Sequence, residues 1–160
     1  MNRKKNPTPS DNFAINLNRT LHFLSFRPRS EKEIKDYLEK KKVSSVTASK
    51  IMDKLKEHKF LNDEEFARWF IEQRTKNNPR SLRIINFELK QKGIANEIIE
   101  NSMPTIKSDA EMAAELVEKR ITRYKNLPKE EIYQKLGRYL SSKGFSWEII
   151  KKSIDEQFVK

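Results

Sequence analysis

Apolar residues recur along this chain at intervals of three and four, the spacing that places them on one face of an α-helix. The alternation typical of β-strands is absent. The pattern predicts helices near residues 13–25, 31–41, 45–59, 63–76, 81–92, 95–103, 109–125, 129–142 and 146–158. Because each helix has only one apolar face, it must bury that face against neighbouring helices. The sequence therefore predicts an all-α fold.

The apolar pattern also repeats at a fixed distance. Pro28-Arg29-Ser30 recurs 51 residues later as Pro79-Arg80-Ser81, and leucines follow the same interval at Leu38, Leu89 and Leu140. A fixed period of this length is typical of tandem structural repeats. We expect three tandem three-helix repeats that form an elongated, curved array. The expected boundaries are a disordered basic tail at 1–11, repeat 1 at 12–61, repeat 2 at 62–103 and repeat 3 at 104–160.

Several predicted helix boundaries carry specific signals. Ser30 and Ser108 each precede a glutamate by three residues, which is the spacing of a capping box. Gly93 and Gly144 lie where a helix is expected to end in a left-handed residue. Lys42 stands at the matching place in repeat 1, so we expect that helix to end differently.

Charge adds a preference for polyanionic partners. The chain has 34 basic and 23 acidic residues, a net charge of +11. Repeat 1 holds 12 basic and 6 acidic residues, repeat 2 holds 7 of each, and repeat 3 holds 12 and 9. Basic surfaces bind phosphate backbones through the release of counterions. Repeat 1 therefore carries most of the excess charge available for such binding.

Basic residues gather around the start of the second helix in repeats 1 and 2. An arginine there can hold a phosphate together with free N–H groups, or pair with a carboxylate of a protein partner. For any single residue the competing interpretation is a solvated face with local ion pairs, such as Lys32 with Asp36. The candidates are Arg27, Arg29, Lys32, Lys35, Arg74, Lys76, Arg80 and Arg83.

Signals for catalysis are weak. The chain has no cysteine, and His22 and His58 do not form a metal-ligand spacing, so surface or helix-end positions are expected for both. Three scattered glycines cannot build a phosphate-binding loop, and Asp63 begins a predicted helix whose dipole it complements. We expect no enzyme activity, no metal and no cofactor. No apolar run is long enough to span a membrane, and the basic start lacks a signal region, so a cytoplasmic location is expected.

The two tryptophans are candidates for stacking on bases. Trp147 follows the apolar spacing of the last predicted helix, which favours a place in the core. Trp69 lies at the edge of its apolar stripe, and the sequence leaves both interpretations open.

One motif runs through the middle of the chain. Its residues are Phe60-Leu61-Asn62-Asp63-Glu64-Glu65-Phe66-Ala67-Arg68, then Arg74, Pro79-Arg80, Arg83-Ile84, Glu88-Leu89 and Lys92-Gly93-Ile94. This motif resembles the central motif of the RecX family. The upstream Arg27-Pro28-Arg29-Ser30 resembles that family's first repeat. The resemblance covers about residues 12–155. The sequence departs from the family's pattern at Asn62, Ser81 and Lys42.

The resemblance implies a non-enzymatic regulator of the RecA recombinase in DNA repair, homologous recombination and the SOS response. Such a protein binds the RecA–DNA filament, touches single- or double-stranded DNA, and lowers ATPase activity, filament extension and strand exchange. Repeat 2 would then dock on RecA through Arg68, Arg74, Arg80 and Arg83. We expect a monomer. Two alternatives stay open: a helical DNA-binding protein that acts without RecA, and a protein-only helical adaptor.

Overall fold

In this computed structural model residues 12–76 and 78–159 are described, so the predicted tail at 1–11 lies outside the described residues. Across the described ranges the chain forms nine α-helices, two 3₁₀ helices and no strand. The helices are α1 (Phe13–Ser25), α2 (Glu31–Lys40), α3 (Ser45–Glu57), α4 (Asp63–Thr75), α5 (Leu82–Gln91), α6 (Asn96–Ser102), η1 (Met103–Thr105), α7 (Asp109–Ile121), η2 (Thr122–Tyr124), α8 (Lys129–Ser142) and α9 (Trp147–Val159).

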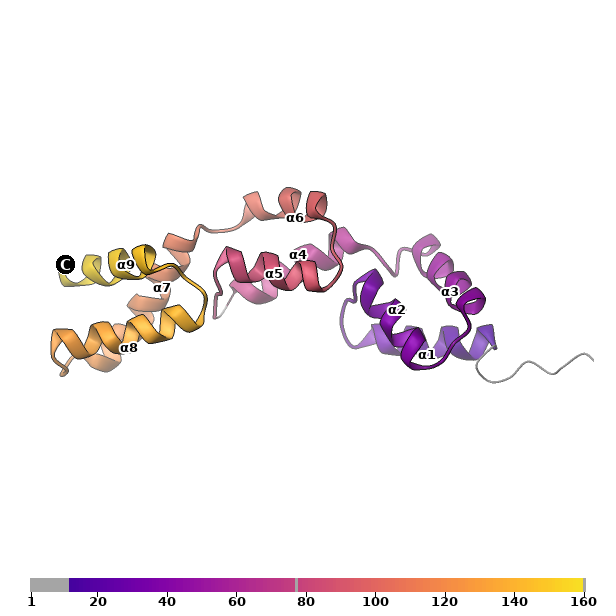
Figure 1. Ribbon diagram of the computed structural model, residues 1–160, viewed down its shortest axis with the longest axis horizontal. Helices are drawn as coiled ribbons and strands as arrows, with labels where there is room; N and C mark the ends of the chain where they lie inside the picture. Colours follow the sequence, from indigo (N-terminus) through magenta and orange to yellow (C-terminus); the bar gives the residue numbers. More distant parts are fainter. Residues whose placement is uncertain (1–11, 77, 160) are drawn as a thin grey trace, which may run out of the picture.

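The helices form three groups of three that follow one another along the longest axis of the molecule (Figure 1). α1–α3 lie at one end, α4–α6 in the middle and α7–α9 at the other end. Each group encloses its own cluster of buried apolar side chains. The predicted all-α class, with three tandem three-helix repeats in an elongated array, is confirmed.

The leucine that recurs every 51 residues lies in the centre of each cluster. Leu38 is 1% exposed, and Leu89 and Leu140 are 0% exposed. Burying a leucine side chain stabilises a fold by about 1.5–3 kcal/mol. The repeat in the sequence therefore marks the core position that each three-helix group needs.

The second helix of every repeat ends in the same way. Lys42, Gly93 and Gly144 have φ values of 57°, 78° and 87°, all in the left-handed region. In each case the next residue donates its N–H to the carbonyl of the repeated leucine, as Ile94 does to Leu89 at 3.1 Å. The expectation that the helix before Lys42 ends differently is wrong, because lysine adopts the left-handed conformation there.

Neighbouring repeats contact each other through the motifs that recur in the sequence. We call the contact between repeats 1 and 2 the first joint and the contact between repeats 2 and 3 the second joint. At the first joint the Ser30 hydroxyl donates to the Lys92 carbonyl at 2.7 Å. At the second joint the Ser81 N–H donates to the Lys143 carbonyl at 3.0 Å. Both serines are fully buried. The Pro-Arg-Ser motif of one repeat therefore packs on the helix end of the next repeat.

An aspartate completes each joint. Asp63 begins α4 and accepts a hydrogen bond from the Glu31 N–H of α2 at 2.8 Å. Asp109 begins α7 and accepts from the Leu82 N–H of α5 at 2.7 Å. Each carboxylate therefore satisfies a free N–H at the start of a helix in the preceding repeat. Burial raises the pKa of Asp63, and the hydrogen bond from Glu31 opposes this shift.

The prediction that Trp147 belongs to the core is wrong, because its side chain is 63% exposed. Phe145, which precedes α9, is buried at this end of the repeat, and Ile150 and Ile154 supply the buried face of the helix. Trp69 is half-buried against the core of repeat 2, where the Arg27 guanidinium lies 5.7 Å from the centre of its ring.

The described residues contain no helix that is both long enough and apolar enough to cross a membrane. His22 lies in the last turn of α1, and His58 follows the end of α3. Both are exposed, as expected from the sequence.

Candidate interaction surface

The nine predicted contact residues separate into those that hold the fold together and those that face solvent. Lys35, Arg68 and Arg83 are exposed and form no hydrogen bond or ion pair with any described residue. Their side chains are therefore available to a partner, and the charge of Lys35 also opposes the raised pKa of Asp63. The other six interact within the chain.

Arg27 belongs to a half-buried ion-pair cluster at the first joint. Its guanidinium donates two hydrogen bonds to Glu33, at 2.8 and 3.1 Å, and Lys92 of repeat 2 donates to the same carboxylate at 2.8 Å. The Ser30 N–H adds a further hydrogen bond at 3.2 Å and completes the predicted capping box. Burial would raise the pKa of Glu33, but the hydrogen bonds from Arg27, Lys92 and Ser30 outweigh it and lower the pKa to about 2.

This lowered pKa makes the first joint sensitive to acid. Glu33 stabilises the fold above its unfolded pKa near 4.3, and this contribution is lost as the pH falls toward 2. We expect Glu33→Gln to lower the free energy of unfolding by up to about 3 kcal/mol at pH 7, and by much less at pH 2.5. Urea unfolding at the two pH values measures the difference.

Glu57→Gln is the matched control, because Glu57 is 69% exposed in a pair with Lys54 at 3.5 Å. Exposed pairs of this kind contribute little, so this variant should unfold like the parent chain at both pH values. An equal loss of stability at pH 7 and pH 2.5 in Glu33→Gln would show that charge at Glu33 does not hold the joint.

Arg29 stacks inside repeat 1. Its guanidinium carbon lies 3.8 Å from the centre of the Phe23 ring, and Phe23 in turn stacks on Tyr37 with 4.2 Å between ring centres. Burial, followed by the neighbouring charge of Arg27, lowers the pKa of Arg29. This guanidinium therefore supports the packing of α1 on α2.

Arg74 and Arg80 share one carboxylate inside repeat 2. Arg74 Nε and Arg80 Nη1 each lie 2.6 Å from an oxygen of Glu88, whose side chain is only 18% exposed. The pair ties the end of α4 and the loop before α5 to α5 itself. Removing either arginine would leave Glu88 with one partner, so these two residues have a structural role.

Lys32 and Lys76 form exposed pairs within their own helical segments. Lys32 Nζ lies 2.7 Å from Asp36, and Lys76 Nζ lies 3.7 Å from Glu72. Solvent-exposed pairs contribute about 0–1 kcal/mol, so a partner can replace them at little cost. The competing interpretation of Lys32 from the sequence, a local pair with Asp36, describes the contact that the structure shows.

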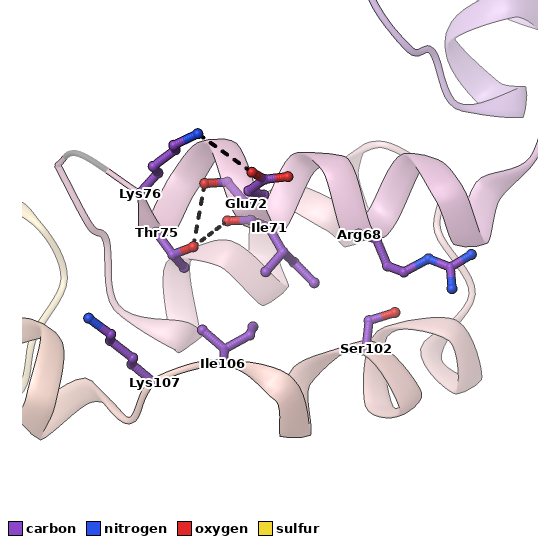
Figure 2. Close-up of a pocket in the computed structure, with 8 residues that line it drawn as sticks. All are labelled: Arg68, Ile71, Glu72, Thr75, Lys76, Ser102, Ile106 and Lys107. Atoms are coloured by element: carbon purple, nitrogen blue, oxygen red, sulfur yellow. Dashed lines mark hydrogen bonds and ion pairs between the residues drawn. The ribbon is translucent and has the colours of Figure 1, made fainter.

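A groove on repeat 2 brings two of the predicted residues together. It has a volume of about 500 Å³ and lies between α4 and the segment from α6 to α7 (Figure 2). Ile71 and Ile106 give it an apolar lining, and polar side chains surround them. Its lining residues are Arg68, Ile71, Glu72, Thr75, Lys76, Ser102, Ile106 and Lys107. A partly apolar groove with three cations and one carboxylate suits an acidic, partly apolar segment of a partner protein.

The second joint holds a basic cluster that sequence reasoning missed. Arg120 and Lys143 both lie over the Tyr139 ring, at 3.6 and 5.6 Å from its centre, and the Tyr139 hydroxyl donates to Asn78 at 3.0 Å. Burial, then the charges of Arg80 and Arg120, lowers the pKa of Lys143. These residues come from two repeats, and only the recurrence of Lys143 51 positions after Lys92 hinted at their meeting.

Within the described residues, no group of three or more His, Asp or Glu side chains is placed to hold a metal ion. The described surface presents cations, aromatic rings and a mixed polar and apolar groove on an extended helical array. This combination defines a helical repeat protein suited to binding along an extended partner.

Comparison with known proteins gives the family. Three family models match successive parts of the chain: the first three-helix domain of RecX at residues 17–55, the second at 62–103 and the third at 108–154. The regulatory protein RecX of Clostridium tetani is 33% identical over 153 residues, which is 91% of this chain and 68% of that protein. The chain belongs to the RecX family.

Other relatives agree with this assignment. The regulatory protein RecX of Bacillus pumilus is 38% identical over 85% of this chain and 52% of that protein. The chain spans about half the length of the Bacillus relatives it matches. The crystal structure of RecX from Lactobacillus salivarius superposes with a TM-score of 0.74 at 26% identity, over 92% of this chain and 97% of that one.

Proposed function

We propose that this chain regulates the RecA recombinase by binding the RecA–DNA filament, and that it inhibits ATP hydrolysis, filament extension and strand exchange. Membership of the RecX family supports the proposal, since the relatives are regulatory proteins by name. The observation that carries it is the elongated array of three repeats held by repeated joints (Figure 1). An array of this kind can contact several protomers of a periodic filament at once, as a compact protein of the same mass cannot.

The charge distribution indicates which repeat contacts DNA and which contacts RecA. Repeat 1 has 12 basic and 6 acidic residues, so it is suited to DNA phosphates or to an acidic protein surface. In repeat 2, Arg68 and Lys76 border the groove that can accept an acidic segment of RecA. Lys35 and Arg83 add exposed charges on α2 and α5. The proposed action is binding, and no chemical step is required of the chain.

The experiment that tests the proposal is RecA's ATP hydrolysis on single-stranded DNA, with RecA from the same source and this chain added below the RecA concentration. We expect a progressive fall in the rate at such ratios, because each bound copy affects many protomers of a filament. The readout is the steady-state rate against the ratio of chain to RecA.

Two other outcomes would overturn the proposal. Inhibition that begins only when the chain is sufficient to coat the DNA would indicate competition for DNA without RecA binding. An unchanged rate at every ratio would favour a protein-only adaptor.

A further inference from the structure

An exposed aromatic strip lies on the outer surface of repeat 3. Trp147 is 63% exposed at the first position of α9, and its Cζ3 lies 3.5 Å from the place that a Cβ on Gly137 of α8 would occupy. Beside it, Tyr133 of α8 stacks on Phe158 of α9 with 5.8 Å between ring centres and 11° between ring planes. We call Trp147, Tyr133 and Phe158 the aromatic strip.

Two open hollows meet at this strip, and Trp147 and Tyr133 line both of them. The first, of about 400 Å³, is completed by Lys129, Glu130 and Lys151. The second, of about 510 Å³, is completed by Gln134, Gly137, Arg138 and Ser141. Gly137 is buried, and because it carries no side chain the Trp147 indole can pack closely against α8.

Cations outnumber carboxylates in the two hollows, and Lys151 also borders a further hollow on α9 that Glu148, Asp155 and Glu156 line. Arg138 and Lys151 are exposed and make no hydrogen bond or ion pair with described residues, and Lys129 Nζ lies 4.8 Å from the centre of the Phe158 ring. Glu130 is the one carboxylate that lines either hollow. The two hollows therefore carry three positive charges and one negative charge around the exposed Trp147 indole and the half-buried Tyr133 ring.

We propose that the aromatic strip binds single-stranded nucleic acid. Bases stack on Trp147 and Tyr133, while Lys129, Arg138 and Lys151 hold the phosphates. Exposed aromatic rings beside unpaired cations are the features by which proteins bind single strands without reading their sequence. Three cations against one carboxylate in the two hollows favour a polyanion over an apolar protein segment. The inference deepens the proposed function, on which it rests, by assigning a DNA contact to repeat 3.

Tryptophan fluorescence tests the proposal directly, because the chain has only two tryptophans. In Trp69→Phe the emission comes from Trp147 alone, and titration with a thymidine oligonucleotide is expected to quench it. Trp147→Ala is expected to bind the same oligonucleotide about tenfold more weakly. Phe87→Ala is the control, since Phe87 is 60% exposed on α5 of repeat 2 and should leave the affinity unchanged.

The outcomes separate this inference from the proposed function, because the titration contains no RecA. Emission that the oligonucleotide leaves unchanged would overturn the inference, even if the parent chain still inhibits RecA's ATPase. Emission that responds only to RecA would show that the aromatic strip is a protein-binding surface and would also overturn it. Quenching of the Trp147 emission by the oligonucleotide, without inhibition of RecA's ATPase, would support the aromatic strip as a DNA site. That result would count against the proposed function but not against this inference.

Discussion

Replacing Gly144 with alanine is expected to lower the free energy of unfolding by about 2–4 kcal/mol, since the change adds left-handed strain to overpacking. Gly144 has a φ of +87°, a backbone angle that residues with a side chain rarely adopt. A Cβ at this position would lie 2.5 Å from side-chain carbons of Ile84 and 2.6 Å from the Ser81 hydroxyl. Ser81 is fully buried at the joint between repeats 2 and 3, so the joint must open to admit the methyl group.

Gly137→Ala is the matched control for this prediction. Gly137 lies inside α8, where a Cβ would make an ordinary contact at 3.5 Å with Trp147. Alanine in place of an interior helix glycine is expected to raise stability by about 0.5–1 kcal/mol. Urea unfolding followed by circular dichroism measures both variants. A Gly144→Ala protein as stable as the parent chain would show that the joint does not depend on this glycine.

The same comparison explains why a lysine takes the glycine's place in repeat 1. At Gly93 and Gly144 an added Cβ would strike the preceding repeat, at 2.7 Å from Lys32 in the first case and 2.5 Å from Ile84 in the second. Lys42 lies in the first of the described repeats and is exposed. The left-handed strain alone is small enough for lysine to tolerate at this position.

The fold was largely predictable because it depends on local patterns. Helical spacing, caps and the 51-residue interval identify the helices and their grouping without knowledge of the three-dimensional structure. Trp147 shows where this reasoning fails. Spacing places it on the apolar face of α9, but Phe145 is buried at that end of repeat 3, so the indole stays outside.

The candidate site was less predictable, since ion pairs depend on tertiary contacts. Arg29 and Arg80 occupy matching places 51 residues apart, yet one stacks on Phe23 and the other pairs with Glu88. The register does differ at one position, since Glu88 of repeat 2 corresponds to Tyr37 of repeat 1, but the sequence alone does not show that either residue faces the arginine. The recurrence of Arg29 as Arg80 within the Pro-Arg-Ser motif was itself a signal, because a repeated position more often serves the repeat than a single ligand.

The exposed cations supply the clearest test of how the chain contacts a filament. Replacing Arg68 and Arg83 together with alanine is expected to weaken binding to the RecA–DNA filament about ten- to hundredfold. Both side chains face solvent without a partner among described residues, so their loss removes contacts to the filament and leaves the fold intact. Affinity for preformed filaments, measured by fluorescence anisotropy over a range of salt concentrations, gives the result.

A double variant of Lys90 and Lys119 to alanine is the matched control, since these exposed lysines also lack partners among described residues and the net charge changes by the same amount. Equal weakening in both double variants would mean that overall charge, and not the position of Arg68 and Arg83, governs binding.

Arg80→Ala differs in kind, because it takes one partner from the mostly buried Glu88. It is expected to lower the free energy of unfolding, so a loss of binding there cannot be assigned to the filament contact. Arg68 and Arg83 can therefore report on binding separately from folding, and a weaker salt dependence in their double variant would place those contacts on DNA phosphates.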